Sequence, residues 1–197
     1  MRFLPLFVFA LLAAGLANAA PNFKESGSPS APMTIELYTD YQCPHCRAFY
    51  LEVLPELTKE YINTGKVRLI HRDFRLSQMP FSKTATRYAN AAGQIGRYDA
   101  VAKQIFETQP EWSQNGNVDG EIAKVLPPGE MQKIREIIKT DPRLDEQTIK
   151  DEAMAINEDH LTATPTIVIV YKGKRETVSG GGTWPLLKSY IDSKLGK

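Results

Sequence analysis

The alternation of apolar and polar residues predicts that the fold opens with a strand, a helix and a second strand. Residues 33–39 mix β-branched and aromatic side chains in rough alternation, which is typical of a strand. From Phe49 to Tyr61 apolar residues recur at helical spacing around Pro55, so we expect a bent helix. Residues 66–72 alternate again and predict the second strand. Together these elements form a βαβ unit.

The middle of the chain, residues 77–160, contains no convincing strand pattern. Helical periodicity occurs in four segments, residues 83–92, 98–106, 131–138 and 146–157. Glycine and proline mark turns between these segments, most clearly from Pro110 to Gly120. We therefore predict a block of helices here.

The C-terminal part returns to strand patterns. Residues 166–171 form a run of β-branched residues, and residues 175–178 follow after a short turn, which predicts an antiparallel hairpin. Three consecutive glycines, 180–182, connect the hairpin to an amphipathic segment, residues 184–195, with Thr183 as the expected helix cap. The fold class predicted by these patterns is α/β.

The first residues resemble an export signal rather than part of the fold. Arg2 precedes an apolar run from Phe3 to Ala14, and Ala-Asn-Ala follows at residues 17–19. The run is shorter than the roughly 20 apolar residues of a membrane-spanning helix. We expect residues 1–19 to be a signal peptide that is cleaved after Ala19. Residues 20–32 are rich in Ser, Pro and Gly and predict a flexible leader.

Charge and cysteine content narrow the function further. The formal net charge is only +1 and no basic stripe is present, so we expect no nucleic-acid partner. The chain has two cysteines, Cys43 and Cys46, in the motif Cys-Pro-His-Cys. A disulfide between them would close a very small loop and add little stability, so redox chemistry explains the pair better.

The predicted position of the motif assigns different roles to the two cysteines. Cys43 falls at the N-terminus of the helix, where the helix dipole and free backbone amides favour a thiolate. Pro44 suits the first helical turn, and His45 can donate a hydrogen bond or positive charge to the Cys43 sulfur. Cys46, one turn further along, is expected to be the less exposed thiol that resolves a mixed disulfide.

A zinc site is the structural alternative for the same cysteines, with His71 and His160 completing four ligands. Structural zinc sites usually contain a second clustered pair of ligands, and these histidines are far apart in the sequence. We therefore expect no metal.

The segment 34–74, with Asp-Tyr-Gln-Cys-Pro-His-Cys at residues 40–46, resembles the DsbA-like branch of the thioredoxin superfamily. Thr164-Pro165-Thr166, directly before a predicted strand, is similar to the cis-proline element of that family. The resemblance implies a thioredoxin fold made of residues 33–76 and 161–197, with an inserted helical domain at residues 77–160.

The resemblance also implies roles for residues outside the motif. Thr164–Pro165 would have a cis peptide bond that faces Cys43, and the Thr164 backbone would pair with a substrate peptide; the alternative is a trans proline that begins an edge strand. Many relatives have a buried acid as a proton relay six residues before the first cysteine, where this chain has Leu37. Glu36 could replace it only if the strand carries a bulge, and otherwise faces solvent.

The implied function is an exported, periplasmic thiol–disulfide oxidoreductase, working as a monomer. It would donate the Cys43–Cys46 disulfide to folding secreted proteins through a mixed disulfide at Cys43, and a membrane quinone-linked thiol oxidase would reoxidise it. No cofactor other than the disulfide is expected. A disulfide reductase or isomerase would use the same cysteines. A periplasmic holdase, which only binds unfolded chains, would not need them.

Overall fold

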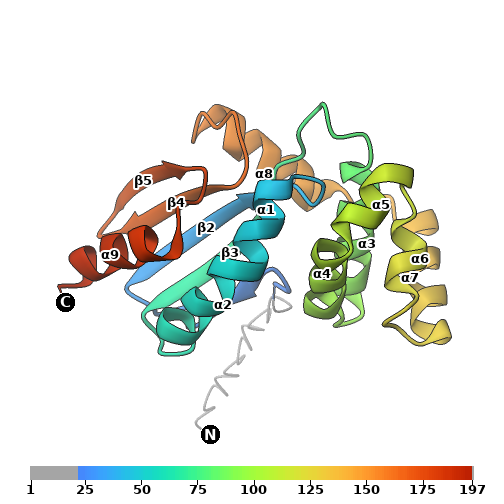
Figure 1. Cartoon of the computed structure of the whole chain (residues 1–197), viewed down its shortest axis with the longest axis horizontal. Coiled ribbons are helices and arrows are strands. Elements are labelled where there is room, and N and C mark those ends of the chain that lie inside the picture. Colours follow the sequence, from blue (N-terminus) through green and yellow to red (C-terminus); the bar gives the residue numbers. More distant parts are fainter. Residues whose placement is uncertain (1–21, 197) are drawn as a thin grey trace, which may run out of the picture.

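A five-stranded mixed sheet forms the centre of the protein in a computed structural model that describes residues 22–196 (Figure 1). Its strand order is β1-β3-β2-β4-β5, with β2 and β3 parallel and the other neighbouring strands antiparallel. The predicted βαβ unit and C-terminal hairpin therefore belong to one sheet. The strands are β1 (Glu25–Ser26), β2 (Met33–Thr39), β3 (Val67–Asp73), β4 (Thr166–Tyr171) and β5 (Lys174–Ser179).

The helix after β2 is continuous but changes its winding. It consists of α1 (Pro44–Ala48), a π-helical turn η1 (Phe49–Val53), α2 (Leu54–Leu57) and a second π-helical turn η2 (Thr58–Ile62). Pro55 has no backbone N–H to donate, and the wider turn η1 lies directly before the α2 turn that contains it. The predicted bend is thus a change from α to π winding around the proline.

The two faces of the sheet are covered by different helices. Leu37 points to the face covered by η1, α2, η2 and α9 (Trp184–Leu195), where it packs in one core with Phe49 and Ile167. Tyr38 points to the opposite face and packs with Ala155 of α8 (Glu146–Asn157). α8 therefore covers the sheet, although it lies within the segment that we assigned to the helical insertion.

The other inserted helices pack beside the sheet as a separate layer (Figure 1). The predicted turn from Pro110 to Gly120 is wrong, because much of it is helical. Pro110 lies in the first turn of its helix, where its missing N–H has no cost, and Gly116 ends that helix at a positive φ of 76°. These helices are α3 (Ser82–Gln94), α4 (Tyr98–Glu107), α5 (Gln109–Asn115), α6 (Val118–Ile122) and α7 (Pro128–Thr140).

The prediction of a flexible leader is also wrong for residues 24–26. Residues 25–26 form β1, which pairs with β3 at the edge of the sheet. Beside it, the ammonium group of Lys24 forms an ion pair with Asp73, and both side chains are almost fully buried. Asp73 also accepts a hydrogen bond from Thr148 of α8 at 2.6 Å. A buried lysine is costly unless it is paired, so this ion pair fixes the leader to the sheet.

The expected signal peptide, residues 1–19, lies outside the described residues. Within residues 22–196, none of the helices has the length and hydrophobicity that a membrane crossing requires.

Replacing Lys24 with methionine tests the docking of the leader. Lys24→Met leaves the Asp73 carboxylate buried without its cation, which we expect to lower the free energy of unfolding by about 3 kcal/mol. Urea denaturation would measure the loss. Lys59→Met is the control, because the Lys59 side chain is 77% exposed and 4.0 Å from its partner Glu56. Equal midpoints for Lys24→Met and the wild type would contradict a docked leader.

Candidate functional site

The two cysteines lie where β2 meets α1. Cys43 is the N-cap residue of α1 and Pro44 occupies the first turn, as the motif predicted. Both cysteines are free thiols, and their exposed fractions are only 4% for Cys43 and 0% for Cys46. Both also belong to the hydrophobic core of the helical layer. The redox motif therefore lies at the boundary between the sheet and the inserted helices.

The loop before β4 contacts Cys43. The Thr164–Pro165 peptide bond is cis, and the Cys43 thiol donates a hydrogen bond to the Thr164 carbonyl oxygen at 3.4 Å. Gly181, in the glycine-rich connection, packs on the far side of this proline. A Cβ atom at Gly181 would lie 3.1 Å from Pro165 and 2.7 Å from the Phe49 ring, so a side chain would displace the loop.

The surroundings of the two sulfurs have opposite effects on their acidity. The hydrogen bond from the Cys46 thiol is the largest cause that lowers the pKa of Cys43 to about 5, and burial opposes it. The backbone amides of Cys46 and His45 lower that pKa further. Burial raises the pKa of Cys46 well above its ordinary value, and its hydrogen bond to Cys43 acts in the same direction. The site therefore favours a Cys43 thiolate beside a neutral Cys46 thiol.

His45 contributes to this site in two ways. Its backbone amide is one of the donors to the Cys43 sulfur, whereas its imidazole is exposed. The imidazole lines a groove of about 450 Å³ together with Phe49, Gly182 and Trp184. This groove begins beside the redox motif and lies between η1 and the start of α9.

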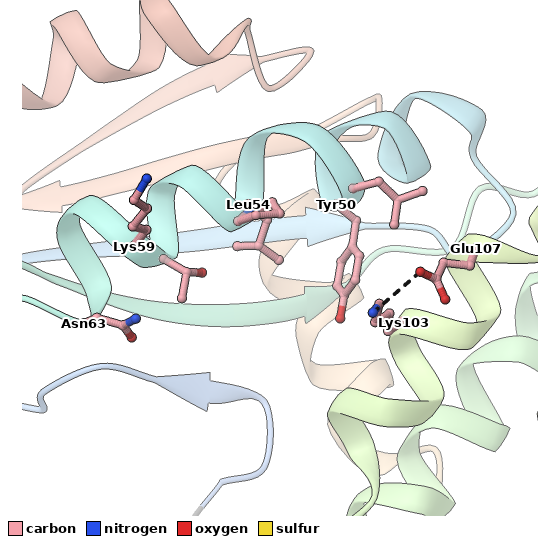
Figure 2. Close-up of a pocket in the computed structure, with 9 residues that line it drawn as sticks. Tyr50, Leu54, Lys59, Asn63, Lys103 and Glu107 are labelled. Atoms are coloured by element: carbon pink, nitrogen blue, oxygen red, sulfur yellow. Dashed lines mark ion pairs between the residues drawn. The ribbon is translucent and has the colours of Figure 1, made fainter. Parts of the chain in front are cut away.

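A second groove, of about 510 Å³, follows the same long helix away from the cysteines (Figure 2). Tyr50 and Leu54 form part of its lining, and Lys103 and Glu107 of α4 stand opposite them as an ion pair at 3.6 Å. Neither cysteine lines this groove.

A set of buried polar side chains holds the turn before Cys43, and sequence reasoning did not identify them. The Asp40 carboxylate accepts hydrogen bonds from the backbone amides of Gln42 and Leu76, both at 2.7 Å, and from the Ser82 hydroxyl. The Asp40 amide in turn donates to the Cys46 sulfur at 3.5 Å. The motif placed Asp40 close to Cys43, but its partners Leu76 and Ser82 lie in the loop before α3 and in α3, beyond the reach of a local pattern.

Glu36 does not replace the missing acid of the family. The register of β2 with β3 is unbroken from Met33 to Thr39, so the strand has no bulge that would turn Glu36 toward Cys46. Nor does Glu36 face solvent, since only 6% of it is exposed. Its carboxylate pairs with Arg175 at 3.2 Å and Arg72 at 3.5 Å, on the face opposite Leu37. The interpretation of Glu36 as a proton relay is therefore wrong, and so is the alternative that it faces solvent.

The two histidines of the zinc alternative lie on separate elements. His71 is in β3 between the rings of Tyr50 and Tyr98, and burial lowers its pKa to about 4. His160 is exposed in the loop after α8, with a positive φ of 52°. Among the residues that the structure describes, no group of three or more His, Cys, Asp or Glu side chains is arranged to hold a metal ion.

Comparisons with known proteins agree with this geometry. A sequence model of the family described as thioredoxin matches residues 23–192. Disulfide bond formation protein D of Bacillus subtilis is 26% identical over 157 residues, and the match covers 73% of this chain and 65% of that protein. Probable disulfide bond formation protein D of Bacillus anthracis is 33% identical over 101 residues, covering 51% of this chain and 44% of that protein. The chain thus spans less than two thirds of the length of these relatives.

Solved structures extend the likeness to the whole fold. The structure of alpha-DsbA1 of Wolbachia pipientis superimposes with a TM-score of 0.73 at 25% identity, over 90% of this chain and 93% of that one. BdbD of Bacillus subtilis, with a TM-score of 0.70 at 21% identity over 88% and 93% of the two chains, supports the fold alone. These results confirm the predicted α/β thioredoxin fold with a helical insertion. The chain belongs to the thioredoxin family and is a DsbA-like member of it.

Proposed function

We propose that this protein is an exported thiol–disulfide oxidoreductase that donates the Cys43–Cys46 disulfide to folding secreted proteins. The observation that carries the proposal is the environment of Cys43, in which helix-end amides and the Cys46 thiol favour a thiolate. A stabilised thiolate means a stable reduced state, and so a pair that readily accepts electrons. The signal pattern of residues 1–19 supports export to an oxidising compartment such as the periplasm.

In the proposed first step, a substrate thiolate attacks the Cys43 sulfur of the oxidised pair. The Cys43–Cys46 bond breaks, and its electrons go to Cys46 while a mixed disulfide forms at Cys43. The Asp40 amide, 3.5 Å from the Cys46 sulfur, can donate to the charge that develops there. The raised pKa of Cys46 then favours uptake of a proton, which prevents it from returning quickly to attack the mixed disulfide.

In the second step, another substrate thiolate attacks the substrate sulfur of the mixed disulfide. Cys43 leaves as a thiolate, and its low pKa makes it a good leaving group. The substrate loses two electrons and the cysteine pair gains them, so no metal, nucleotide or flavin is needed. A membrane quinone-linked thiol oxidase would then remove the two electrons from the cysteine pair and restore the Cys43–Cys46 disulfide. The cis-proline loop would hold the substrate backbone at Thr164, beside Cys43.

Serine variants of the two cysteines separate their proposed roles. Cys43→Ser should abolish oxidation of a reduced, unfolded test protein, because the attacked sulfur is gone. Cys46→Ser, mixed with a substrate that already contains a disulfide, should accumulate mixed disulfides, because the Cys43 thiolate can attack that disulfide and release one substrate thiolate, but no Cys46 thiol remains to displace the other. Non-reducing gels and a refolding assay would measure both effects. Full activity of Cys43→Ser would contradict the proposal and favour the holdase alternative.

The stability of the reduced protein should rise with pH where that of the oxidised protein does not. The Cys43 pKa is about 5 in the folded state and about 9 for an ordinary cysteine, so between these values unfolding takes up a proton. The free energy of unfolding should therefore gain at most about 1.4 kcal/mol per pH unit above pH 5, and lose this gain as the pH falls through 5. Denaturation of both redox forms at several pH values would measure it. Parallel pH profiles of the two forms would contradict a stabilised thiolate.

Equilibration with glutathione distinguishes an oxidase from a reductase. We expect this protein to be reduced by glutathione mixtures that leave thioredoxin, at roughly −270 mV, oxidised, because only the reduced state contains the stabilised thiolate. Quantifying the two redox forms by thiol alkylation gives the potential. A potential as low as that of thioredoxin would support the reductase alternative.

A further inference from the structure

One glutamine of the helical insertion reaches the backbone of the nucleophile. Gln109 is the first residue of α5, and only 4% of it is exposed. Its side-chain Nε2 donates to two carbonyl oxygens of the active-site turn, that of Tyr41 at 2.7 Å and that of Cys43 at 3.0 Å. A single carboxamide thus joins two alternate peptide groups of the turn to the helical layer.

The Cys43 carbonyl is a sensitive point for such a contact. It also accepts the hydrogen bond from the Arg47 amide at 3.1 Å, which begins the hydrogen-bond pattern of α1. The direction of this carbonyl therefore sets how the first turn of α1 starts, and with it the direction of the His45 and Cys46 amides. Those two amides are donors to the Cys43 sulfur.

The neighbouring residue strengthens the connection to the same helices. Gln42 donates from its side chain to the Ser113 carbonyl of α5 at 3.4 Å, and its side-chain oxygen accepts the Phe81 amide at 2.7 Å. The turn is consequently hydrogen-bonded to the helical insertion at several points. The elements that the turn connects, β2 and α1, belong instead to the thioredoxin unit. Of these contacts, only that of Gln109 is made directly to the nucleophile residue.

We propose that Gln109 is a positioning residue for Cys43, which fixes the Tyr41 and Cys43 carbonyls so that the first amides of α1 face the sulfur. The inference rests on the proposed redox function of Cys43 and gives the helical insertion a part in it. Loss of the carboxamide should therefore make Cys43 less acidic.

Gln109→Met tests this with a side chain of similar length that cannot donate. We expect the Cys43 acidity constant to fall about tenfold, measured by thiolate absorbance during a pH titration of the reduced protein. At neutral pH the equilibrium constant with glutathione should shift by a similar factor, which corresponds to about 30 mV toward a weaker oxidant. Gln109→Leu, which cannot donate either and adds no charge, should shift both quantities in the same direction and provides a second measurement if the methionine variant does not fold.

Gln104 is a matched control in the same helical layer. It is 9% exposed and donates from Nε2 to the Glu121 carbonyl at 3.1 Å, with no contact to the active-site turn. Gln104→Met should lower stability but leave the Cys43 titration and the potential unchanged. If Gln109→Met or Gln109→Leu likewise lowers only stability, Gln109 is purely structural and the inference is wrong. Failure of the wild-type protein to oxidise substrates would instead contradict the proposed function, since the titration does not depend on activity.

Discussion

A negative charge on one almost buried sulfur is the constraint on which the active end of this fold depends. Burial alone would keep Cys43 protonated, so the charge exists only because several donors converge on it. These donors are the first amides of α1 and the Cys46 thiol, and the Thr164 carbonyl of the loop before β4 lies against the same sulfur. The sheet holds these parts together, because β2 and β4 are neighbours and both end at this site.

The same arrangement makes the two cysteines unequal. Cys43 follows β2 after a short turn and caps α1, where backbone amides have no partner within the helix. Cys46 is only one turn further, yet it is fully buried and has the Asp40 amide as its backbone donor. A short distance along the helix thus separates a thiol that ionises easily from one that does not. This difference supports the division of work proposed for them.

The sequence allowed prediction of those features that depend on local patterns. The strands and the long helix each carry a characteristic residue pattern over their own length, and the position of Cys-Pro-His-Cys between them located Cys43 at a helix end. Features that depend on distant partners were missed or misassigned. Glu36 lies 139 positions from Arg175, and Gln109 lies 66 positions from Cys43, so no local pattern could pair them. The leader was misassigned because its serines and glycines outweighed Lys24, whose partner Asp73 is 49 positions away.

The two edges of the sheet have a consequence for a protein that is proposed to work on unfolded chains. Unfolded polypeptides add readily as extra strands to open sheet edges, which leads to aggregation. Here one edge ends in β1, which has only two residues, and the other in β5, which carries Lys174, Arg175 and Glu176 in sequence. A very short strand and a charged strand are both poor templates for strand addition. A client chain would therefore find backbone pairing at the Thr164 loop rather than along the sides of the sheet, and would leave once its sulfur is released.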